Sequence, residues 1–135
     1  MQYLFWQKNI NPNVRNKIYD RLEAFANIHL LPPLDYPNLV YLQKHAKLIL
    51  TDSGGIQEEA PSFACPTLVM RYETERKEGI EAGVSKLVGA DYDKILKESE
   101  KILTSSKAET RLKAQNPYGD GTASKQIETI IRKSL

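Results

Sequence analysis

Short apolar runs alternate along this chain with longer stretches of helical character, and this alternation restricts the fold more than any other feature of the sequence. The apolar runs lie at residues 3–7, 28–31, 47–51, 67–70 and 85–88. Each run is nearly continuous, which is typical of strands that are covered on both faces. Helix signals fill the intervals, beginning with Asn11 and Pro12 at a helix start. The sequence therefore predicts an α/β fold in which helices flank a parallel sheet.

Length and composition exclude several classes of protein. The 135 residues fit one domain, and a hydrophobic content of 41% is enough for a real core. The net charge is only +2 and no basic run occurs, so we expect no nucleic-acid partner. The apolar start at residues 1–6 is too short for a signal peptide or a membrane span, so we expect no membrane association. The single cysteine, Cys65, fits a reducing cytoplasm.

The strongest local signal is the segment T-D-S-G-G-I-Q-E-E-A-P-S-F at residues 51–63. A buried strand ends there in a glycine pair, Gly54 and Gly55, and a helix begins at once. Free backbone N–H groups and the dipole at a helix start attract phosphate, and glycines let it approach closely. In doubly wound folds, ligands bind beyond the carboxyl ends of strands. Glu59, one turn further on, is suited to accept hydrogen bonds from ribose hydroxyls.

The same residues also have purely structural interpretations, which the sequence leaves open. Ser53 is a good N-cap, and the two glycines suit a tight turn. The segment matches neither the dinucleotide fingerprint nor a phosphate loop with its lysine. The charged loop at residues 71–76 is typical of a solvated charge cluster. The turn N-P-Y-G-D-G at residues 116–121 suits a plain helix–helix connection as well as a binding site.

Four ordered segments together resemble the non-hydrolysing UDP-N-acetylglucosamine 2-epimerases. The segment at residues 51–63 looks like the signature of that family. P-L-D-Y at residues 33–36, R-Y-E-T-E-R at 71–76 and N-P-Y-G-D-G at 116–121 match it in the same order. The resemblance covers roughly residues 9–135, and it concerns the carboxy-terminal domain portion only. It implies a partial nucleotide-sugar-binding, Rossmann-like domain at residues 1–135, from a two-domain glycosyltransferase-B-like fold. The first strand would be missing, so the sheet either closes up or leaves apolar edges exposed.

The resemblance also implies which residues bind the substrate. Ser53 and Gly54 would hold the diphosphate, Gly55 would allow its close approach, and Glu59 would bind the ribose. The remaining substrate-binding candidates lie near the sugar-diphosphate cleft: Arg71, Glu75, Arg76 and Asn9.

Two departures from the family pattern bear on this site. Asn9 stands where the family usually has a histidine, so it can hydrogen-bond but cannot carry a charge near neutral pH. Leu39 stands where a phenylalanine usually stacks on uracil, and Tyr36 nearby is suited to compensate. His29 and His45 match no site residue and are expected to be structural or surface groups.

The family reaction removes the C2 proton of UDP-N-acetylglucosamine, expels UDP by anti elimination, and adds it back on the other face to give the manno epimer. The chain is therefore expected to be part of an isomerase. The acid and base at C2 are expected outside this chain, so its catalytic residues are unknown and the chain alone is expected to be inactive. The resemblance implies UDP-N-acetylglucosamine or UDP as ligand, no metal and no cofactor. It is compatible with a separately encoded amino-terminal half, and family members are usually homodimers.

Two other functional hypotheses stay open from the sequence. The chain is alternatively a UDP-sugar-binding or regulatory module that senses its ligand without turnover. A response-regulator-like α/β domain is less favoured, because no acidic pair follows a first strand.

Overall fold

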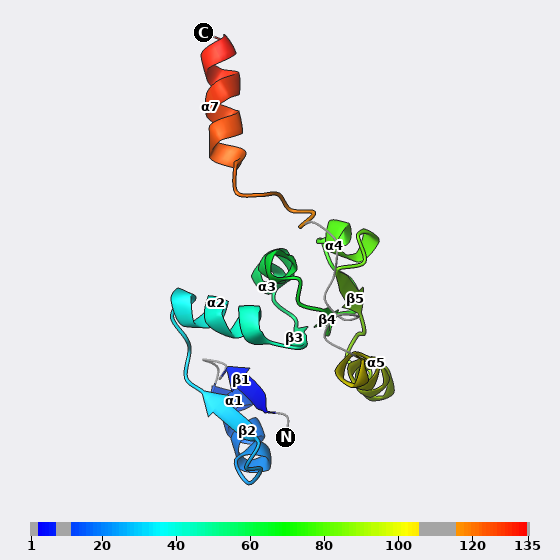
Figure 1. The fold of residues 1–135 in the computed structure, drawn as a ribbon. Helices are drawn as coiled ribbons and strands as arrows, with labels where there is room; N and C mark the ends of the chain where they lie inside the picture. Colours follow the sequence, from blue (N-terminus) through cyan, green and yellow to red (C-terminus); the bar gives the residue numbers. More distant parts are fainter. Residues whose placement is uncertain (1–2, 8–11, 106–115, 135) are drawn as a thin grey trace. The chain divides into compact units, whose positions relative to one another are not determined.

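The computed structural model describes residues 3–7, 12–105 and 116–134 of the chain (Figure 1). The elements belong to two compact units, one at residues 1–41 and one at residues 42–135. Within the described ranges, no helix is both long enough and apolar enough to cross a membrane.

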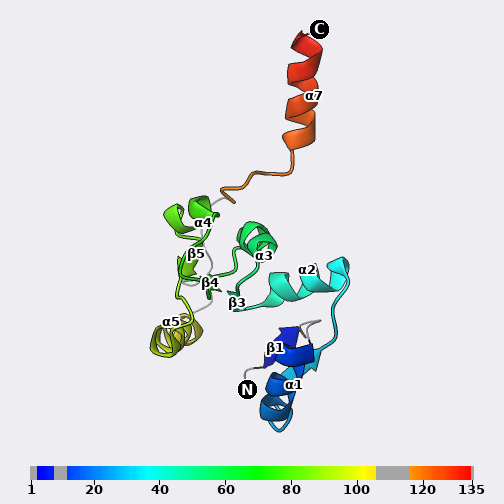
Figure 2. The same ribbon diagram turned by 180° about the vertical axis from the view of Figure 1, so that it is seen from behind.

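The first unit contains a strand–helix–strand motif. Strand β1 (Leu4–Gln7) is followed by helix α1 (Pro12–Leu22) and strand β2 (Ile28–Leu31) (Figure 2). The strands pair in parallel, with Leu4 opposite Ile28. Because parallel neighbours need a crossover connection, the helix between them follows from the pairing. Both strands lie within the apolar runs that predicted them.

Helix α2 (Tyr36–His45) begins at the P-L-D-Y segment and crosses the boundary between the two units. The Asp35 carboxylate accepts a hydrogen bond from the backbone N–H of Asn38 at 3.0 Å, which satisfies one of the amides at the start of the helix. The end of α2 belongs to the second unit, where Gln43 is buried. His45 in its last turn and His29 in β2 are both exposed, as expected of surface groups.

The second unit is built on three parallel strands in the order β3-β4-β5. These are Ile49–Thr51, Thr67–Val69 and Ser85–Leu87. Their last residues stand in register, Thr51 opposite Val69 and Val69 opposite Leu87. Because the strands are parallel and in register, the loops that follow β3 and β4 leave the sheet at the same edge.

Short helices connect these strands. Helix α3 (Gly54–Glu59) continues into the 3₁₀ helix η1 (Ala60–Phe63) after β3, and α4 (Lys77–Glu81) follows β4. Pro61 near the start of η1 cannot donate a backbone hydrogen bond, which favours the change from α to 3₁₀ geometry. The core lies around the central strand, and its buried apolar residues are Ala60, Cys65, Leu68, Val69, Val84 and Val88.

Two longer helices complete the second unit. Helix α5 (Tyr92–Thr104) is capped by Asp91, whose carboxylate accepts from the N–H of Lys94 at 3.0 Å. A hydrogen bond joins its last turn to the segment just before β3, because the Lys47 ammonium donates to the carbonyl of Leu103 at 2.6 Å. Helix α7 (Ala123–Ser134) follows the N-P-Y-G-D-G turn.

The strands of the described residues form two separate sheets, β1-β2 and β3-β4-β5. The predicted class is therefore confirmed as parallel sheets with flanking helices. Apolar side chains are exposed on strands of both sheets: Leu4 is 43%, Phe5 52% and Leu50 38% exposed.

An ion pair joins β5 to α5 and gives the chain a predictable acid sensitivity. Lys86 and Glu98 lie 2.8 Å apart, and the hydrogen bond from Lys86 lowers the pKa of Glu98 below its ordinary value. A lowered carboxyl pKa contributes stability above about pH 4.5, which is lost as the pH falls through the folded-state pKa. We expect Glu98→Gln to have a lower melting temperature than the unchanged chain at pH 7, and we expect this difference to shrink as the pH falls below 4.5. A difference that stays constant with pH would contradict this assignment.

Candidate functional site

The loop after β3 places Ser53, Gly54 and Gly55 at the start of α3. The backbone N–H of Ser53 donates to the Thr51 hydroxyl at 3.0 Å, and the Ser53 hydroxyl accepts from the N–H of Ile56 at 3.5 Å. Ser53 has extended backbone angles, as an N-cap residue should. The capping interpretation of Ser53 is confirmed, while its contact with a diphosphate stays a prediction.

The guanidinium of Arg76 lies directly against Gly54. A Cβ atom at Gly54 would stand 3.0 Å from Cζ and 3.1 Å from Nη2 of Arg76, which is closer than most Cβ contacts in proteins. At Gly55 a Cβ would meet only the Ser53 hydroxyl, at 3.9 Å. The first glycine of the pair therefore makes room for a protein cation, whereas the second has open space beside it.

Arg76 belongs to a four-residue charge network. Its Nε pairs with Glu58 at 2.8 Å, and its Nη1 pairs with Glu75 at 3.4 Å. Arg71 pairs with Glu75 at 3.2 Å. Glu58 raises the pKa of Arg76, and a backbone hydrogen bond and then Arg71 lower the pKa of Glu75. Both pKa shifts favour the charged forms of Glu75 and Arg76, and the two cations and two carboxylates of the network balance one another.

A buried pair of polar side chains fixes the charged loop to α3. The Thr74 hydroxyl donates to Oε1 of Gln57 at 2.8 Å and accepts from the N–H of Arg76 at 3.1 Å. Thr74 is 8% and Gln57 1% exposed. The loop at residues 71–76 is consequently a structured element in contact with Gly54, so the interpretation as a merely solvated cluster is wrong for Thr74 and Arg76.

The turn at residues 116–121 holds α3, η1 and α4 together. The side-chain amide of Asn116 donates to the carbonyl of Glu58 at 3.2 Å and to the Ser62 hydroxyl at 2.7 Å. The Tyr118 hydroxyl accepts from the N–H of Gly79 at 2.9 Å and donates to the carbonyl of Arg76 at 3.1 Å.

Tyr118 is half-buried, and its burial raises the pKa of the phenol, so the hydroxyl remains a neutral donor. The structure thus favours a supporting role for this turn over a plain helix connection, because its side chains fix the backbone at Arg76.

Glu59 has a separate partner. Its Oε2 accepts a hydrogen bond of 2.9 Å from the side-chain amide of Gln43, on the last turns of α2. Glu59 itself is half-buried.

Four of the predicted site residues thus form one contact group, and three others lie in or next to the helix that begins at Gly54. Gly54, Arg71, Glu75 and Arg76 are joined by contacts, Ser53 and Gly55 flank Gly54, and Glu59 ends the same short helix. Asn9 lies outside the described residues.

Sequence reasoning missed the side chains that support this group: Gln43, Gln57, Glu58, Thr74, Asn116 and Tyr118. Most of them lie inside the recognised segments, but Gln43 does not. Its only sequence signal is that a polar residue stands four positions after Leu39, on the apolar face of the predicted helix.

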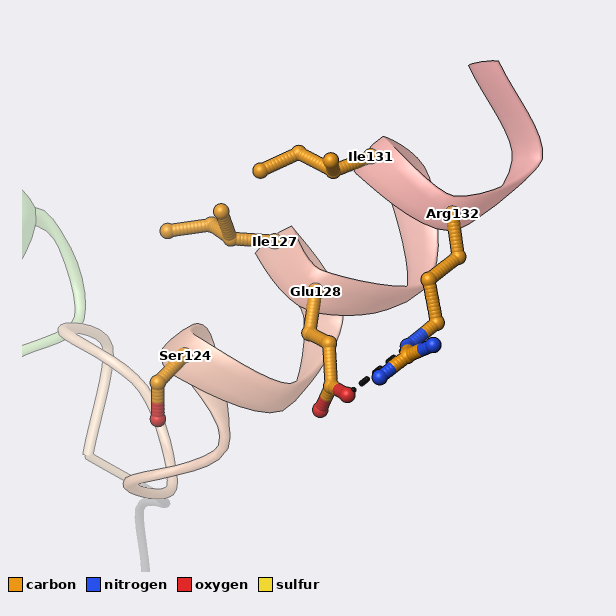
Figure 3. Close-up of a pocket in the computed structure, with 5 residues that line it drawn as sticks. All are labelled: Ser124, Ile127, Glu128, Ile131 and Arg132. Carbon is orange, nitrogen blue, oxygen red and sulfur yellow. Dashed lines mark hydrogen bonds and ion pairs between the residues drawn. The ribbon is translucent and has the colours of Figure 1, made fainter. Parts of the chain in front are cut away.

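Hollows on the surface lie elsewhere. One is lined by Lys17, Ile18, Asp20 and Arg21 of α1, and another by Ser124, Ile127, Glu128, Ile131 and Arg132 of α7. In the second, Ile127 and Ile131 project from one side of the helix, and Glu128 pairs with Arg132 at 2.9 Å (Figure 3). Neither hollow includes a predicted site residue. Among the described residues, no group of three or more His, Cys, Asp or Glu side chains is arranged to hold a metal.

Comparison with known proteins gives a consistent result. The sequence model of one family, described as UDP-N-acetylglucosamine 2-epimerase, matches residues 2–132. A UDP-N-acetylglucosamine 2-epimerase of Campylobacter jejuni is 48% identical over 126 residues, which are 93% of this chain and 33% of the relative. The chain therefore spans about a third of the length of the curated relatives it matches.

Solved structures agree with the sequence match. UDP-GlcNAc 2-epimerase from Neisseria meningitidis, bound to UDP-GlcNAc, has a TM-score of 0.84 and 41% identity, and covers 97% of this chain and 36% of its own. The enzyme from Methanocaldococcus jannaschii, in complex with UDP-GlcNAc and UDP, has a TM-score of 0.81 and 32% identity, with 97% and 36% coverage. The parallel sheets, the motif segments in contact and these matches show that the chain belongs to the UDP-N-acetylglucosamine 2-epimerase family.

Proposed function

We propose that this chain is the nucleotide-sugar-binding part of a UDP-N-acetylglucosamine 2-epimerase. The proposed overall reaction removes the C2 proton, expels UDP, and returns it to the other face of the resulting 2-acetamidoglucal to give UDP-N-acetylmannosamine. We assign the binding of UDP to this chain and the proton transfers at C2 to residues outside it. We further propose a reducing, cytoplasmic setting, in line with the buried thiol of Cys65.

The observation that carries the proposal is the contact between Arg76 and Gly54. It joins two segments of the family pattern at the edge where the strands end, which is where doubly wound folds bind ligands. The bonds of Arg76 to Glu58 and Glu75 use Nε and Nη1, while Nη2 lies beside the glycine. A guanidinium nitrogen next to free backbone amides is a suitable donor pair for a diphosphate oxygen.

Each part of the site has a defined task under this proposal. The amides after Ser53 and the Nη2 group of Arg76 bind the diphosphate, which is the leaving group of the elimination. Stabilising the charge on that leaving group lowers the barrier to its departure. Glu59 binds the ribose and thereby fixes where the diphosphate lies.

The direct test is calorimetric titration of the purified 135-residue chain with UDP and with UDP-N-acetylglucosamine. We expect both to bind, and we expect Glu59→Ala to weaken UDP binding by about ten- to a hundredfold, because a hydrogen bond to a charged group contributes roughly 1.5–3 kcal/mol. Glu100→Ala, at an exposed carboxylate on α5, is the matched control and should bind as the unchanged chain does.

A folded chain that binds neither ligand would overturn the assignment of UDP binding to this part. A second experiment addresses the remainder of the proposal. Adding the amino-terminal part of a family member should yield epimerase activity that neither part has alone, measured as UDP-N-acetylmannosamine formed. Binding without activity in that mixture would instead favour a UDP-sugar-binding or regulatory module.

A further inference from the structure

We propose that Gln43 sets the ribose selectivity of the nucleotide site by holding the carboxylate of Glu59. This inference rests on the proposed function and extends it to a residue outside the recognised segments. Gln43 is on α2, sixteen residues before Glu59 in the sequence.

The geometry is that of an oriented carboxylate. The amide nitrogen of Gln43 donates to Oε2 of Glu59 at 2.9 Å. Within the described part of the chain, no hydrogen bond engages Oε1 of Glu59. A carboxylate has about four acceptor positions, so a bond at one oxygen fixes the group and leaves the other oxygen for hydroxyl donors. The two hydroxyls of a ribose are donors of this kind.

The burial of Gln43 supports a specific role for its amide. The side chain is only 3% exposed, and its own oxygen is buried without a hydrogen-bond partner among the described residues. A buried polar atom without a partner is unfavourable and uncommon. An apolar side chain of the same size would avoid this cost, so the bond to Glu59 is what distinguishes glutamine at this position.

This arrangement has a consequence for ligand choice. A site that hydrogen-bonds a hydroxyl rejects an analogue that lacks it, because the acceptor is then left unpaired. If Gln43 holds Glu59 in place, discrimination against a nucleotide that lacks a ribose hydroxyl must depend on Gln43. If the residue only tied α2 to α3, its replacement would weaken the binding of both nucleotides equally.

The experiment compares UDP with 2′-deoxy-UDP by calorimetry on the full chain. We expect the unchanged chain to prefer UDP by about tenfold or more. Gln43→Met keeps the side-chain volume and removes the donor. It should lose most of this preference through weaker UDP binding, with the affinity for 2′-deoxy-UDP unchanged within about twofold. Lys44→Met, an exposed neighbour on the same helix, should keep the full preference.

The outcomes separate the two proposals. If Gln43→Met keeps the preference for UDP, or loses affinity for both nucleotides equally, the proposed role of Gln43 is wrong while the proposed function stands. If the unchanged chain binds no UDP, the proposed function fails and the inference fails with it. Should Gln43→Met not fold, Gln43→Asn serves as the second variant, because its shorter amide cannot keep the bond to Glu59.

Discussion

Replacement of Gly79 by alanine is expected to destabilise the chain by about 1–3 kcal/mol, and in a chain that already carries Tyr118→Phe it is expected to cost much less. A Cβ at Gly79 would lie 2.6 Å from the Tyr118 hydroxyl but 3.4 Å from Cζ. The clash is therefore with the oxygen alone. Tyr118→Phe by itself removes the hydrogen bonds to Gly79 and Arg76 and should cost about 1–2 kcal/mol.

Urea unfolding of the four proteins measures this coupling. Because the two positions are in contact, we expect the loss in the double variant to be smaller than the sum of the two single losses. The same variants also test the support of the candidate site, because the Tyr118 hydroxyl donates to the carbonyl of Arg76. Strict additivity of the two changes would show that the hydroxyl does not lie against Gly79.

The second large effect is expected at Gly54. The Arg76 guanidinium stands 3.0 Å from the Cβ position at Gly54, so we expect the larger side chain of valine to displace the guanidinium. We expect UDP affinity to fall by about tenfold or more, because a charge-assisted hydrogen bond to the diphosphate is lost. Calorimetry gives the affinity, and the NMR signal of the Arg76 Nε–H, now released from Glu58, gives the structural cause.

Gly55→Val is the matched comparison. It introduces the same side chain one residue later in the same helix, where the nearest protein atom is the Ser53 hydroxyl at 3.9 Å. We expect the Arg76 signal to be unchanged in this variant, so any loss of UDP affinity would report on the approach of the ligand itself. Unaltered UDP binding by Gly54→Val would remove Arg76 from the proposed site.

The strands were predictable because each is a short, almost uninterrupted apolar run. Leu68 and Val69 on the central strand are consecutive apolar residues, and both are buried. A run of this kind predicts a strand that is covered on both faces. The helix caps were local as well: Ser53 and Asp35 each bond to an amide three residues ahead. Features that depend on neighbours within one turn are therefore visible in the sequence.

The support of the candidate site could not be predicted in the same way. Arg76 packs on Gly54 across 22 positions of sequence, and a glycine pair alone does not reveal whether a ligand or a side chain fills the space it leaves. The pairing of Gln57 with Thr74 joins residues 17 apart, and that of Gln43 with Glu59 joins residues 16 apart. Such contacts depend on strand register and helix placement, which no local pattern specifies.

The hydrogen bonds of the Tyr118 hydroxyl to Gly79 and Arg76 also bear on the order in which the candidate site is formed during synthesis. Arg76 is synthesised 42 residues before Tyr118, whose hydroxyl donates to the Arg76 carbonyl. On a ribosome that adds about 5–20 residues per second, the two are separated by roughly 2–8 s. The residues of β3 and β4 are synthesised before Arg76 and those of β5 shortly after it, so all three strands precede Tyr118 in the chain. The last support of the candidate site therefore comes from a residue that is synthesised after the three strands of the sheet.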